Sequence, residues 1–128
     1  GLGWVTPSEV DQFGLTAAVG LAMQRALDQI SGDYDQIIID GNYNFMSNNL
    51  KATTIIRADE TVPAVSAASI VAKVARDEYM MKLNIRYPDY GFERHVGYGT
   101  AVHLTALKTL GVTPEHRKSY KPIQALLQ

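Results

Sequence analysis

The first thirty residues place apolar positions at the period of a helix. Thr6 can cap a helix, Pro7 suits its first turn and Glu9 completes a capping box, so a short helix is predicted to begin at Pro7. Gly14 is expected to end it. A longer helix is predicted over residues 16–30. Its apolar stripe consists of Val19, Met23, Ala26 and Ile30.

Two short apolar segments follow, and each leads into an aspartate. The segment QIIID ends at Asp40 and is followed by a glycine, and the segment ATTIIRAD ends at Asp59. Both are predicted to be strands with a carboxylate at the end. Three consecutive isoleucines without alternation indicate a strand that is buried on both faces, as in a sheet covered by helices.

The second half of the chain is predicted to be mostly helical. A long helix is expected over residues 61–87, stopped by Pro88, and its small residues in AVSAAS indicate close packing against the sheet. Further helices are expected over residues 100–110 and, briefly, after Pro122. The order helix, strand, strand, helix places the chain in the α/β class.

Length and composition fit one globular domain. The chain has 128 residues, of which 46% are hydrophobic and 20% charged, and this balance argues against disorder. No apolar segment approaches the roughly 18 residues of a membrane span. With no cysteine, neither a disulfide framework nor a thiolate zinc site can form, which fits a reducing, cytoplasmic location. Two strands rarely form a stable sheet alone, so we expect further strands to belong beside them.

Charge is divided unevenly along the chain. The net charge is −1, but from Arg94 to the C-terminus five basic residues stand against one acid, Glu115, and all three histidines lie in the same stretch. A nuclease that uses divalent metal ions needs this division, because carboxylates hold the metal while cations meet phosphate. A chance asymmetry on a solvated surface explains the charges equally well.

Asp40 and Asp59 are the strongest candidates for chemistry. Both are predicted to end neighbouring strands, where side chains leave the packed layer while the backbone stays rigid. Two carboxylates in one place repel unless a cation lies between them, and Mg²⁺ is the natural cation for an all-oxygen site. Paired metal ions activate water and stabilise the leaving oxygen in phosphodiester hydrolysis. The alternative is that both acids are turn residues of an unrelated α/β domain.

Other polar residues have structural explanations of equal weight. Ser69, Lys73 and Asp77 share one helical face, which is either a solvent-exposed stripe or a face close to the site. Glu60 could reach the same metal as Asp59, but an acid in the first turn of a helix is stabilising in its own right. None of the three histidines has the partner at i+3 or i+4 that a helical metal site requires.

Three segments together are similar to one known family. RADETVPAVSAASIVAKVARDEYM, YPDYGFERHVGYGTAVHLTAL and GVTPEHRKSYKPI resemble ribonuclease HII, the type 2 ribonuclease H family, and the similarity extends from Gly1 to the C-terminus. The resemblance implies a ribonuclease H-like mixed sheet flanked by helices, with a C-terminal helical extension. It implies an endonuclease of DNA replication and repair that cuts the RNA strand of RNA–DNA hybrids, and cuts 5′ of ribonucleotides embedded in duplex DNA. The reaction would be two-metal hydrolysis with Mg²⁺ or Mn²⁺.

The resemblance also assigns roles to individual residues. Asp40 and Asp59 would be catalytic ligands of the metal ions. Lys73 and Asp77 are predicted to support the site because of their shared helical face and not because of the resemblance. Tyr98 of GYGT would stack on the sugar beside the ribonucleotide, where an aromatic face senses the sugar without base identity; the alternative is a hydrogen-bonded packing tyrosine. Residues of the C-terminal motif would contact phosphate or hold the extension in place. They are His116, Arg117 and Ser119.

Some positions depart from the family pattern. At Val96 the family usually has lysine, and His95 and His103 match positions that either dock a loop or touch nucleic acid. The Asp-Glu pair and the Gly-Arg-Gly loop of the family's N-terminal strand have no counterpart here. We therefore expect that the chain lacks an N-terminal segment of the same protein, holds two of four metal-site carboxylates and is nearly inactive alone.

Two domain roles follow from this interpretation. Residues 1–90 would form a partial ribonuclease H-like catalytic domain, and residues 91–128 a helical extension that contacts nucleic acid. The alternative is a non-catalytic module that binds duplexes through its basic tail and Tyr98.

Overall fold

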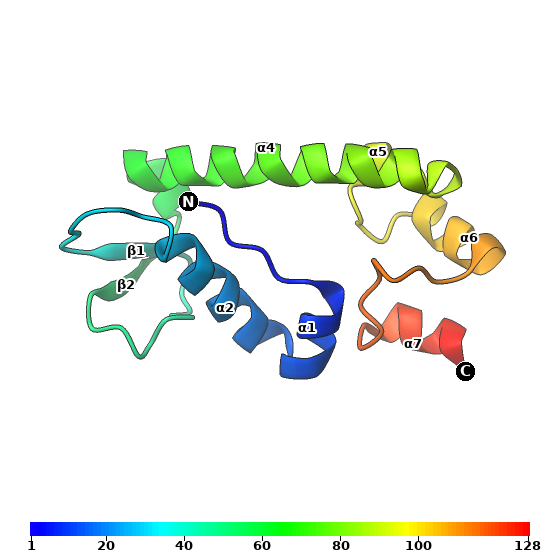
Figure 1. Ribbon diagram of the computed structural model, residues 1–128, viewed down its shortest axis with the longest axis horizontal. Helices are drawn as coiled ribbons and strands as arrows, with labels where there is room; N and C mark the ends of the chain where they lie inside the picture. The colour runs from blue at the N-terminus through cyan, green and yellow to red at the C-terminus, as the bar shows by residue number, and fades with distance from the viewer. The chain divides into compact units, whose positions relative to one another are not determined.

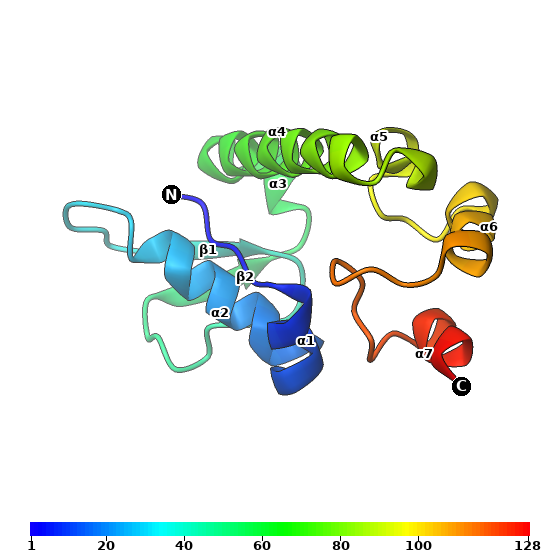
Figure 2. The same cartoon turned by 45° about the vertical axis from the view of Figure 1, so that its right-hand side comes forward.

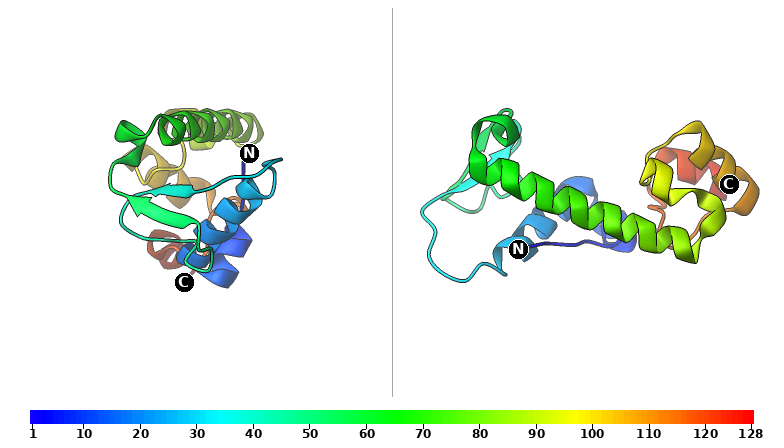
Figure 3. Two further views of the ribbon diagram at one scale, coloured as in Figure 1. Left: turned by 90° about the vertical axis from the view of Figure 1, so that its left-hand side faces the viewer. Right: turned by 90° about the horizontal axis from the view of Figure 1, so that it is seen from above.

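The chain forms two compact units, and each is described by itself. The computed structural model describes all residues, 1–128; the first unit comprises Gly1–Ile70 and the second Val71–Gln128. The division falls within the long helix α4 (Pro63–Arg86), which is drawn as one continuous helix in Figures 1 and 3. The functional boundary expected after residue 90 stays a prediction.

The first unit opens with two helices, α1 (Pro7–Phe13) and α2 (Leu15–Leu27). The predicted capping box is confirmed, because Glu9 N–H donates to Thr6 Oγ1 at 3.2 Å and Thr6 N–H donates to Glu9 Oε2 at 2.7 Å. Gly14 separates the two helices, as predicted. The predicted end of the second helix at Ile30 is wrong, since Ile30 N–H turns back to the carbonyl of Leu27 at 2.9 Å and its side chain is exposed.

An ion pair between Glu9 and Arg25 joins these helices and leads to a pH prediction. Arg25 Nη2 lies 2.6 Å from Glu9 Oε1. Chiefly through this hydrogen bond, the pKa of Glu9 falls from 4.5 to about 2. A lowered pKa in the folded state means that ionised Glu9 stabilises the fold above about pH 4.5 and that this contribution is lost as the pH falls toward 2.

In the variant Arg25→Met, we expect NMR titration of the Glu9 carboxyl carbon to show a pKa that has risen toward 4.5. The variant Arg57→Met serves as the control, because Arg57 pairs with Glu60 and not with Glu9. A Glu9 pKa that stays low in Arg25→Met would contradict the assignment of the shift to this pair.

The sheet of the first unit has two parallel strands, β1 (Ile37–Asp40) and β2 (Ala52–Ile55). Their register places Ile37 opposite Ala52 and Asp40 opposite Ile55, and Figure 2 shows the strands side by side. The prediction that the strands are neighbours is confirmed. Burial on both faces is confirmed only at Ile39, which is 4% exposed, because two strands of four residues offer little surface for covering helices.

Helix α2 approaches the connection between the strands at Gly20. A Cβ atom on Gly20 would lie 2.7 Å from the backbone oxygen of Phe45, which is too close for any side chain. Glycine is therefore required there for the helix to pack against this loop. Residues 41–51, which join the parallel strands, contain no helix of their own.

A short helix, α3 (Ala58–Thr61), precedes α4, and Val62 in extended conformation separates them. The long helix predicted over residues 61–87 is confirmed, with slightly shorter bounds. The prediction that its small residues pack against the sheet is wrong, because Ala67 and Ala68 are exposed. The two narrow strands do not extend far enough to cover this part of α4.

The second unit contains helices and loops but no strand. Its elements after α4 are η1 (Pro88–Tyr90), α5 (Phe92–His95), α6 (Ala101–Leu110) and α7 (Lys121–Leu127). Its core contains Leu83, Tyr90, Phe92, Ala106, Leu107 and Ile123. Tyr90 and Phe92 stack with ring centroids 5.4 Å apart, and Tyr90 donates to the carbonyl of Gly111 at 2.8 Å. The chain is thus α/β and mostly helical, with a small parallel sheet, and none of its helices combines the length and the apolarity needed to cross a membrane.

Candidate functional site

The end of β1 and the start of α3 meet at a carboxylate. Asp40 is the last residue of β1 and is exposed, and its Oδ1 accepts a hydrogen bond from Ala58 N–H at 2.8 Å. Ala58 is buried and immediately precedes Asp59. The bond therefore holds the backbone beside Asp59 against the carboxylate of Asp40.

The prediction that Asp59 ends a strand is wrong. Strand β2 ends at Ile55, and Asp59 lies in the first turn of α3. The reason is Arg57, whose left-handed backbone (φ 57, ψ 38) turns the chain out of the sheet and lets Ala58 N–H reach Asp40. Sequence pattern alone extends the strand through Ile56 to Asp59, because an arginine gives no signal of positive φ.

The donor set at this place fits a hard cation only in part. Asp40 and Asp59 offer carboxylate oxygens, which are the ligands that Mg²⁺ and Mn²⁺ prefer. Glu60 is paired with Arg57 at 2.5 Å, so its structural explanation is sufficient. No group of three or more histidine, aspartate or glutamate side chains is arranged to hold a metal ion. Two carboxylates suffice for Mg²⁺ when phosphate oxygens and water complete its coordination.

Tyr98 lies in the loop between α5 and α6 of the second unit, and its side chain is 62% exposed. Its backbone N–H donates to the carbonyl of His95 at 2.8 Å. Arg76 of α4 donates from Nη1 to Tyr98 Oη at 3.3 Å, and its guanidinium carbon lies 5.7 Å from the centre of the ring. An exposed ring held by its backbone and its hydroxyl is a suitable surface for stacking, whereas a packing tyrosine would be buried.

Lys73 and Asp77 form ion pairs next to Arg76 in helix α4. Lys73 Nζ lies 2.9 Å from Asp77 Oδ2, and Arg76 Nη2 lies 3.3 Å from Asp77 Oδ1. The hydrogen bond from Lys73 is the main reason that the pKa of Asp77 is lowered. The predicted supporting pair is thus close to Arg76 and, through it, to Tyr98. Sequence reasoning missed Arg76 itself, although its place directly before Asp77 was a usable signal.

The three residues of the C-terminal motif have different environments. His116 is buried, with Nδ1 3.1 Å from the N–H of Thr113, so its geometry favours holding the extension in place over touching phosphate. Arg117 is exposed, and its guanidinium lies 5.2 Å from the ring centre of Tyr120. Ser119 is exposed as well. The phosphate roles of all three stay predictions.

A cavity of about 350 Å³ in the second unit brings several of these side chains together. Much of its lining is apolar, and it also includes Arg76, Tyr98, Arg117, Tyr120 and one acid, Glu115. Cations interleaved with aromatic rings are the usual lining of a groove that follows a nucleic-acid backbone.

Comparison with known proteins decides the family. A family model described as Ribonuclease HII matches residues 4–123. The chain belongs to the ribonuclease HII family.

Several curated relatives carry the name ribonuclease HII. The chain is 47% identical over 118 residues to that of Coxiella burnetii (strain RSA 493 / Nine Mile phase I), which covers 92% of this chain. It is 44% identical over 129 residues to that of Shewanella loihica and 43% identical over 125 residues to that of Staphylococcus aureus (strain Newman), covering 99% and 98% of this chain. The chain spans 58%, 62% and 48% of the lengths of these three relatives.

Two residues other than glycine have positive φ, and each lies two positions before a candidate ribonuclease HII site residue. Arg57 precedes Asp59, and Val96 (φ 43) precedes Tyr98. Backbone strain of this kind persists only where the surrounding structure holds it, and it concentrates at functional sites. Arg57 precedes the first residue of α3 and Val96 follows the last residue of α5, so each changes the direction of the chain at a helix end.

The positive φ of Val96 destabilises the fold more than that of Arg57. A β-branched residue in the left-handed region lowers the free energy of unfolding by about 1–2 kcal/mol. Val96→Gly is expected to stabilise the chain by up to about 1 kcal/mol in urea unfolding, since glycine adopts this conformation without strain. Gly97→Ala is the matched control, and it is expected to lower the free energy of unfolding where Val96→Gly raises it. Gly97 has φ 85, and an added Cβ would meet only Met80 Cε at an ordinary 3.4 Å, so its expected destabilisation comes from the backbone alone. Equal effects of the two changes would contradict this account.

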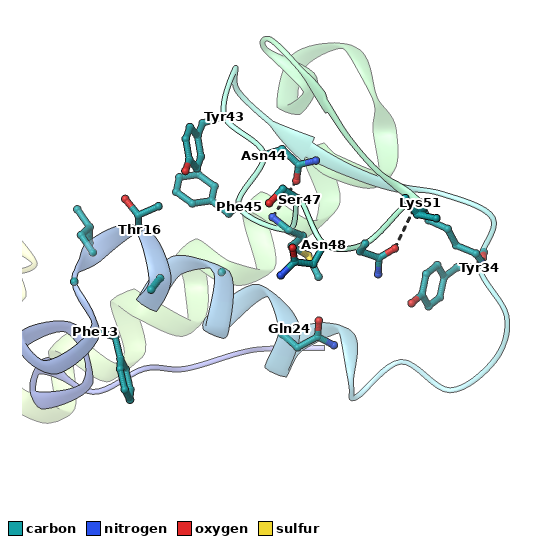
Figure 4. Close-up of a pocket in the computed structure, with 17 residues that line it drawn as sticks. Phe13, Thr16, Gln24, Tyr34, Tyr43, Asn44, Phe45, Ser47, Asn48 and Lys51 are labelled. Atoms are coloured by element: carbon teal, nitrogen blue, oxygen red, sulfur yellow. Dashed lines mark hydrogen bonds between the residues drawn. The ribbon is translucent and has the colours of Figure 1, made fainter.

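Another cavity of the first unit lies away from Asp40 and Asp59. It measures about 1080 Å³ and is lined by residues of α2 and of the connection from Tyr43 to Lys51 (Figure 4). Neither a carboxylate nor a histidine lines it, and the amine of Lys51 is bound to the carbonyl of Tyr34 at 2.6 Å. This cavity therefore offers no carboxylate or imidazole as a metal ligand, and Asp40 with Asp59 remain the better candidates for the ribonuclease HII site.

Proposed function

We propose that this chain is part of an endonuclease that cuts the RNA strand of RNA–DNA hybrids and cuts duplex DNA 5′ of embedded ribonucleotides. The observation that carries the proposal is the hydrogen bond from Ala58 N–H to Asp40, which keeps a strand-end carboxylate beside Asp59. Family membership supports it, because the relatives are named ribonuclease HII. Its role would lie in DNA replication and repair in the cytoplasm.

Asp40 and Asp59 would hold Mg²⁺ or Mn²⁺ in this enzyme. When bound, such ions polarise the phosphate and activate water for a two-metal hydrolysis. The chain's own contribution is orientation, since the Ala58 N–H that occupies Asp40 Oδ1 fixes how the carboxylate faces its surroundings.

The duplex contacts would come from the second unit. Tyr98 would stack on the sugar beside the ribonucleotide, and Arg117 and Ser119 would contact phosphate. His116 would keep the C-terminal segment in place. Residues 1–90 would thus form the catalytic part, related to the ribonuclease H fold, and residues 91–128 the extension that binds nucleic acid.

Full activity would require residues beyond these 128, as in the longer relatives. Two carboxylates provide only part of the charge that a two-metal site needs, so residues 1–128 alone are expected to cut weakly. Both strands also have an unpaired edge, to which a further segment of the same protein could add.

A cleavage assay tests the proposal. The substrate is a labelled DNA duplex with one ribonucleotide, incubated with Mg²⁺ or Mn²⁺, and an all-DNA duplex is the control. Residues 1–128 are tested alone and mixed with the part of the Coxiella burnetii relative that lies outside the match. We expect cutting 5′ of the ribonucleotide in the mixture, dependent on Asp40. Strong cutting by residues 1–128 alone would refute the need for a further segment, and no cutting in any mixture would refute the nuclease proposal.

A second candidate is a non-catalytic module that binds duplexes. It is favoured by the cavity of the second unit, where Arg76, Tyr98 and Arg117 meet without any need for the two aspartates. The same assay separates the candidates, because a binding module would hold the duplex equally well when Asp40 is replaced and would never cut it.

A further inference from the structure

Three buried histidines hold the loop that contains Tyr98 through hydrogen bonds. His95 and His103 are each 5% exposed and His116 is 7% exposed. The rings of His95 and His103 stack with centroids 4.2 Å apart and planes within 9°. All six ring nitrogens have a hydrogen-bond partner, as buried polar groups require, so each ring is held in one orientation.

The partners fix the direction of a hydrogen-bonded chain. Thr113 N–H donates to His116 Nδ1 at 3.1 Å, so this nitrogen carries no proton and the neutral ring is protonated at Nε2. His116 Nε2 lies 3.1 Å from His103 Nε2, which must therefore accept. His103 is then protonated at Nδ1 and donates to the carbonyl of Tyr98 at 3.0 Å. Burial lowers the pKa of both rings, in agreement with neutral forms.

His95 holds the same loop from the other side. Gly97 N–H donates to its Nδ1 at 3.1 Å, and its Nε2 donates to the carbonyl of Tyr90 at 2.8 Å. Together, the two histidines bind the backbone on both sides of the peptide that joins Gly97 to Tyr98. Because an unpaired buried ring nitrogen is costly, the network is satisfied in one arrangement of the loop and resists others.

We propose that His103 is a positioning residue for Tyr98 and that His116 orients His103, so that the segment from Thr113 to His116 sets how Tyr98 faces a duplex. The inference rests on the proposed function, in which Tyr98 contacts the duplex. It adds a role for two buried residues that acts through the backbone of Tyr98. The side chain of Tyr98 stays 62% exposed while its backbone is held, which is the arrangement that a pre-organised contact requires.

Two substitutions of His103 separate positioning from packing. An asparagine side chain places its NH₂ near the position of Nδ1, so His103→Asn keeps the bond to Tyr98 and loses the contact with His116. His103→Gln reaches the position of Nε2 instead and loses the bond to Tyr98. Binding of residues 1–128 to a fluorescent DNA duplex with one ribonucleotide is measured by anisotropy, and circular dichroism measures the folded fraction of each variant.

We expect His103→Gln to weaken binding about tenfold and His103→Asn to weaken it about twofold, with both proteins folded. In a Tyr98→Ala background, His103→Gln should cause no further loss, because the residue acts through Tyr98. Equal losses in the two variants, or a full loss from His103→Gln in the Tyr98→Ala background, would overturn the proposal.

A measurement without nucleic acid distinguishes failure of this proposal from failure of the proposed function. Long-range proton–nitrogen NMR spectra of the free chain should show His103 protonated at Nδ1 and His116 at Nε2. His103→Gln should shift the Tyr98 amide signal more than His103→Asn does. If these results hold while Tyr98→Ala leaves binding unchanged, positioning stands and the duplex role of Tyr98 fails. The opposite tautomer at His103 would overturn positioning whatever the binding data show.

Discussion

Asp40→Asn will weaken Mn²⁺ binding by the chain while leaving its fold intact. In the wild-type chain, Mn²⁺ should broaden the amide signals of Ala58 and Asp59, because a paramagnetic ion held by two carboxylates lies close to both. Asparagine keeps an oxygen that can accept the 2.8 Å hydrogen bond from Ala58 N–H, but it lacks the charge. We expect the Mn²⁺ affinity to fall at least about tenfold, as one of two anionic ligands is lost.

In the complemented nuclease, the same change should reduce cleavage by about 10²–10³, since metal-bound charge stabilisation amounts to several kcal/mol. Asp35→Asn is the matched control, because Asp35 is an exposed acid of the same unit outside the site. Asp40→Ala adds a structural test, as it also leaves Ala58 N–H unpaired and should lower the free energy of unfolding by about 1–3 kcal/mol. Equal broadening in wild type and Asp40→Asn would rule out Asp40 as a ligand.

The fold could be predicted from the sequence wherever the signal is local. The capping box at Thr6, the break at Gly14 and the stop at Pro88 were all expected, and each depends on residues within one turn of one another. That the two strands are neighbours also followed from their closeness along the chain. Their parallel direction was not predicted, because a short connection without a helix fits an antiparallel pair equally well.

The site could be predicted only in part, because its geometry depends on contacts distant in sequence. Asp59 was expected at a strand end, but the turn at Arg57 and the bond from Ala58 to Asp40 place it in a helix. Arginine gives no sequence signal of positive φ, so the strand predicted from the pattern extends past its observed end at Ile55. The small residues of α4 were expected to pack and are exposed, since the sheet that would cover them has only two strands.

In the second unit, the surroundings of Tyr98 could not be predicted from the sequence either. The tyrosine was identified from the motif GYGT, but neither Arg76 nor the histidine network could be placed by periodicity, because residues from Arg76 to His116 converge only in three dimensions. In the folded chain, the histidine rings accept from or donate to backbone groups of this loop. Such bonds are expected, because buried polar groups need hydrogen-bond partners. The spacing of the three histidines excluded a helical metal site but gave no hint of the hydrogen-bonded chain.

Tyr98→Ala will weaken duplex binding more than any other change outside the acidic pair. Stacking of an aromatic ring on a nucleotide contributes about 1–3 kcal/mol by alanine substitution, so the dissociation constant should rise about 5-fold to 150-fold. Anisotropy with the single-ribonucleotide duplex measures this rise. Tyr98→Phe should lose far less, because the ring remains and only the 3.3 Å contact from Arg76 to the hydroxyl is removed.

Salt dependence and a matched control then separate stacking from charge. Tyr98→Ala should leave the slope of affinity against salt unchanged, since no phosphate is neutralised by a tyrosine, whereas Arg117→Ala should reduce that slope by about 1. Tyr43→Ala removes a tyrosine of similar exposure, 55% against 62%, from the first unit and should not affect binding. If Tyr43→Ala and Tyr98→Ala weakened binding alike, the loss would reflect general surface effects. A changed salt slope in Tyr98→Ala would instead assign the contact to Arg76, whose guanidinium lies against the ring and would be displaced with it.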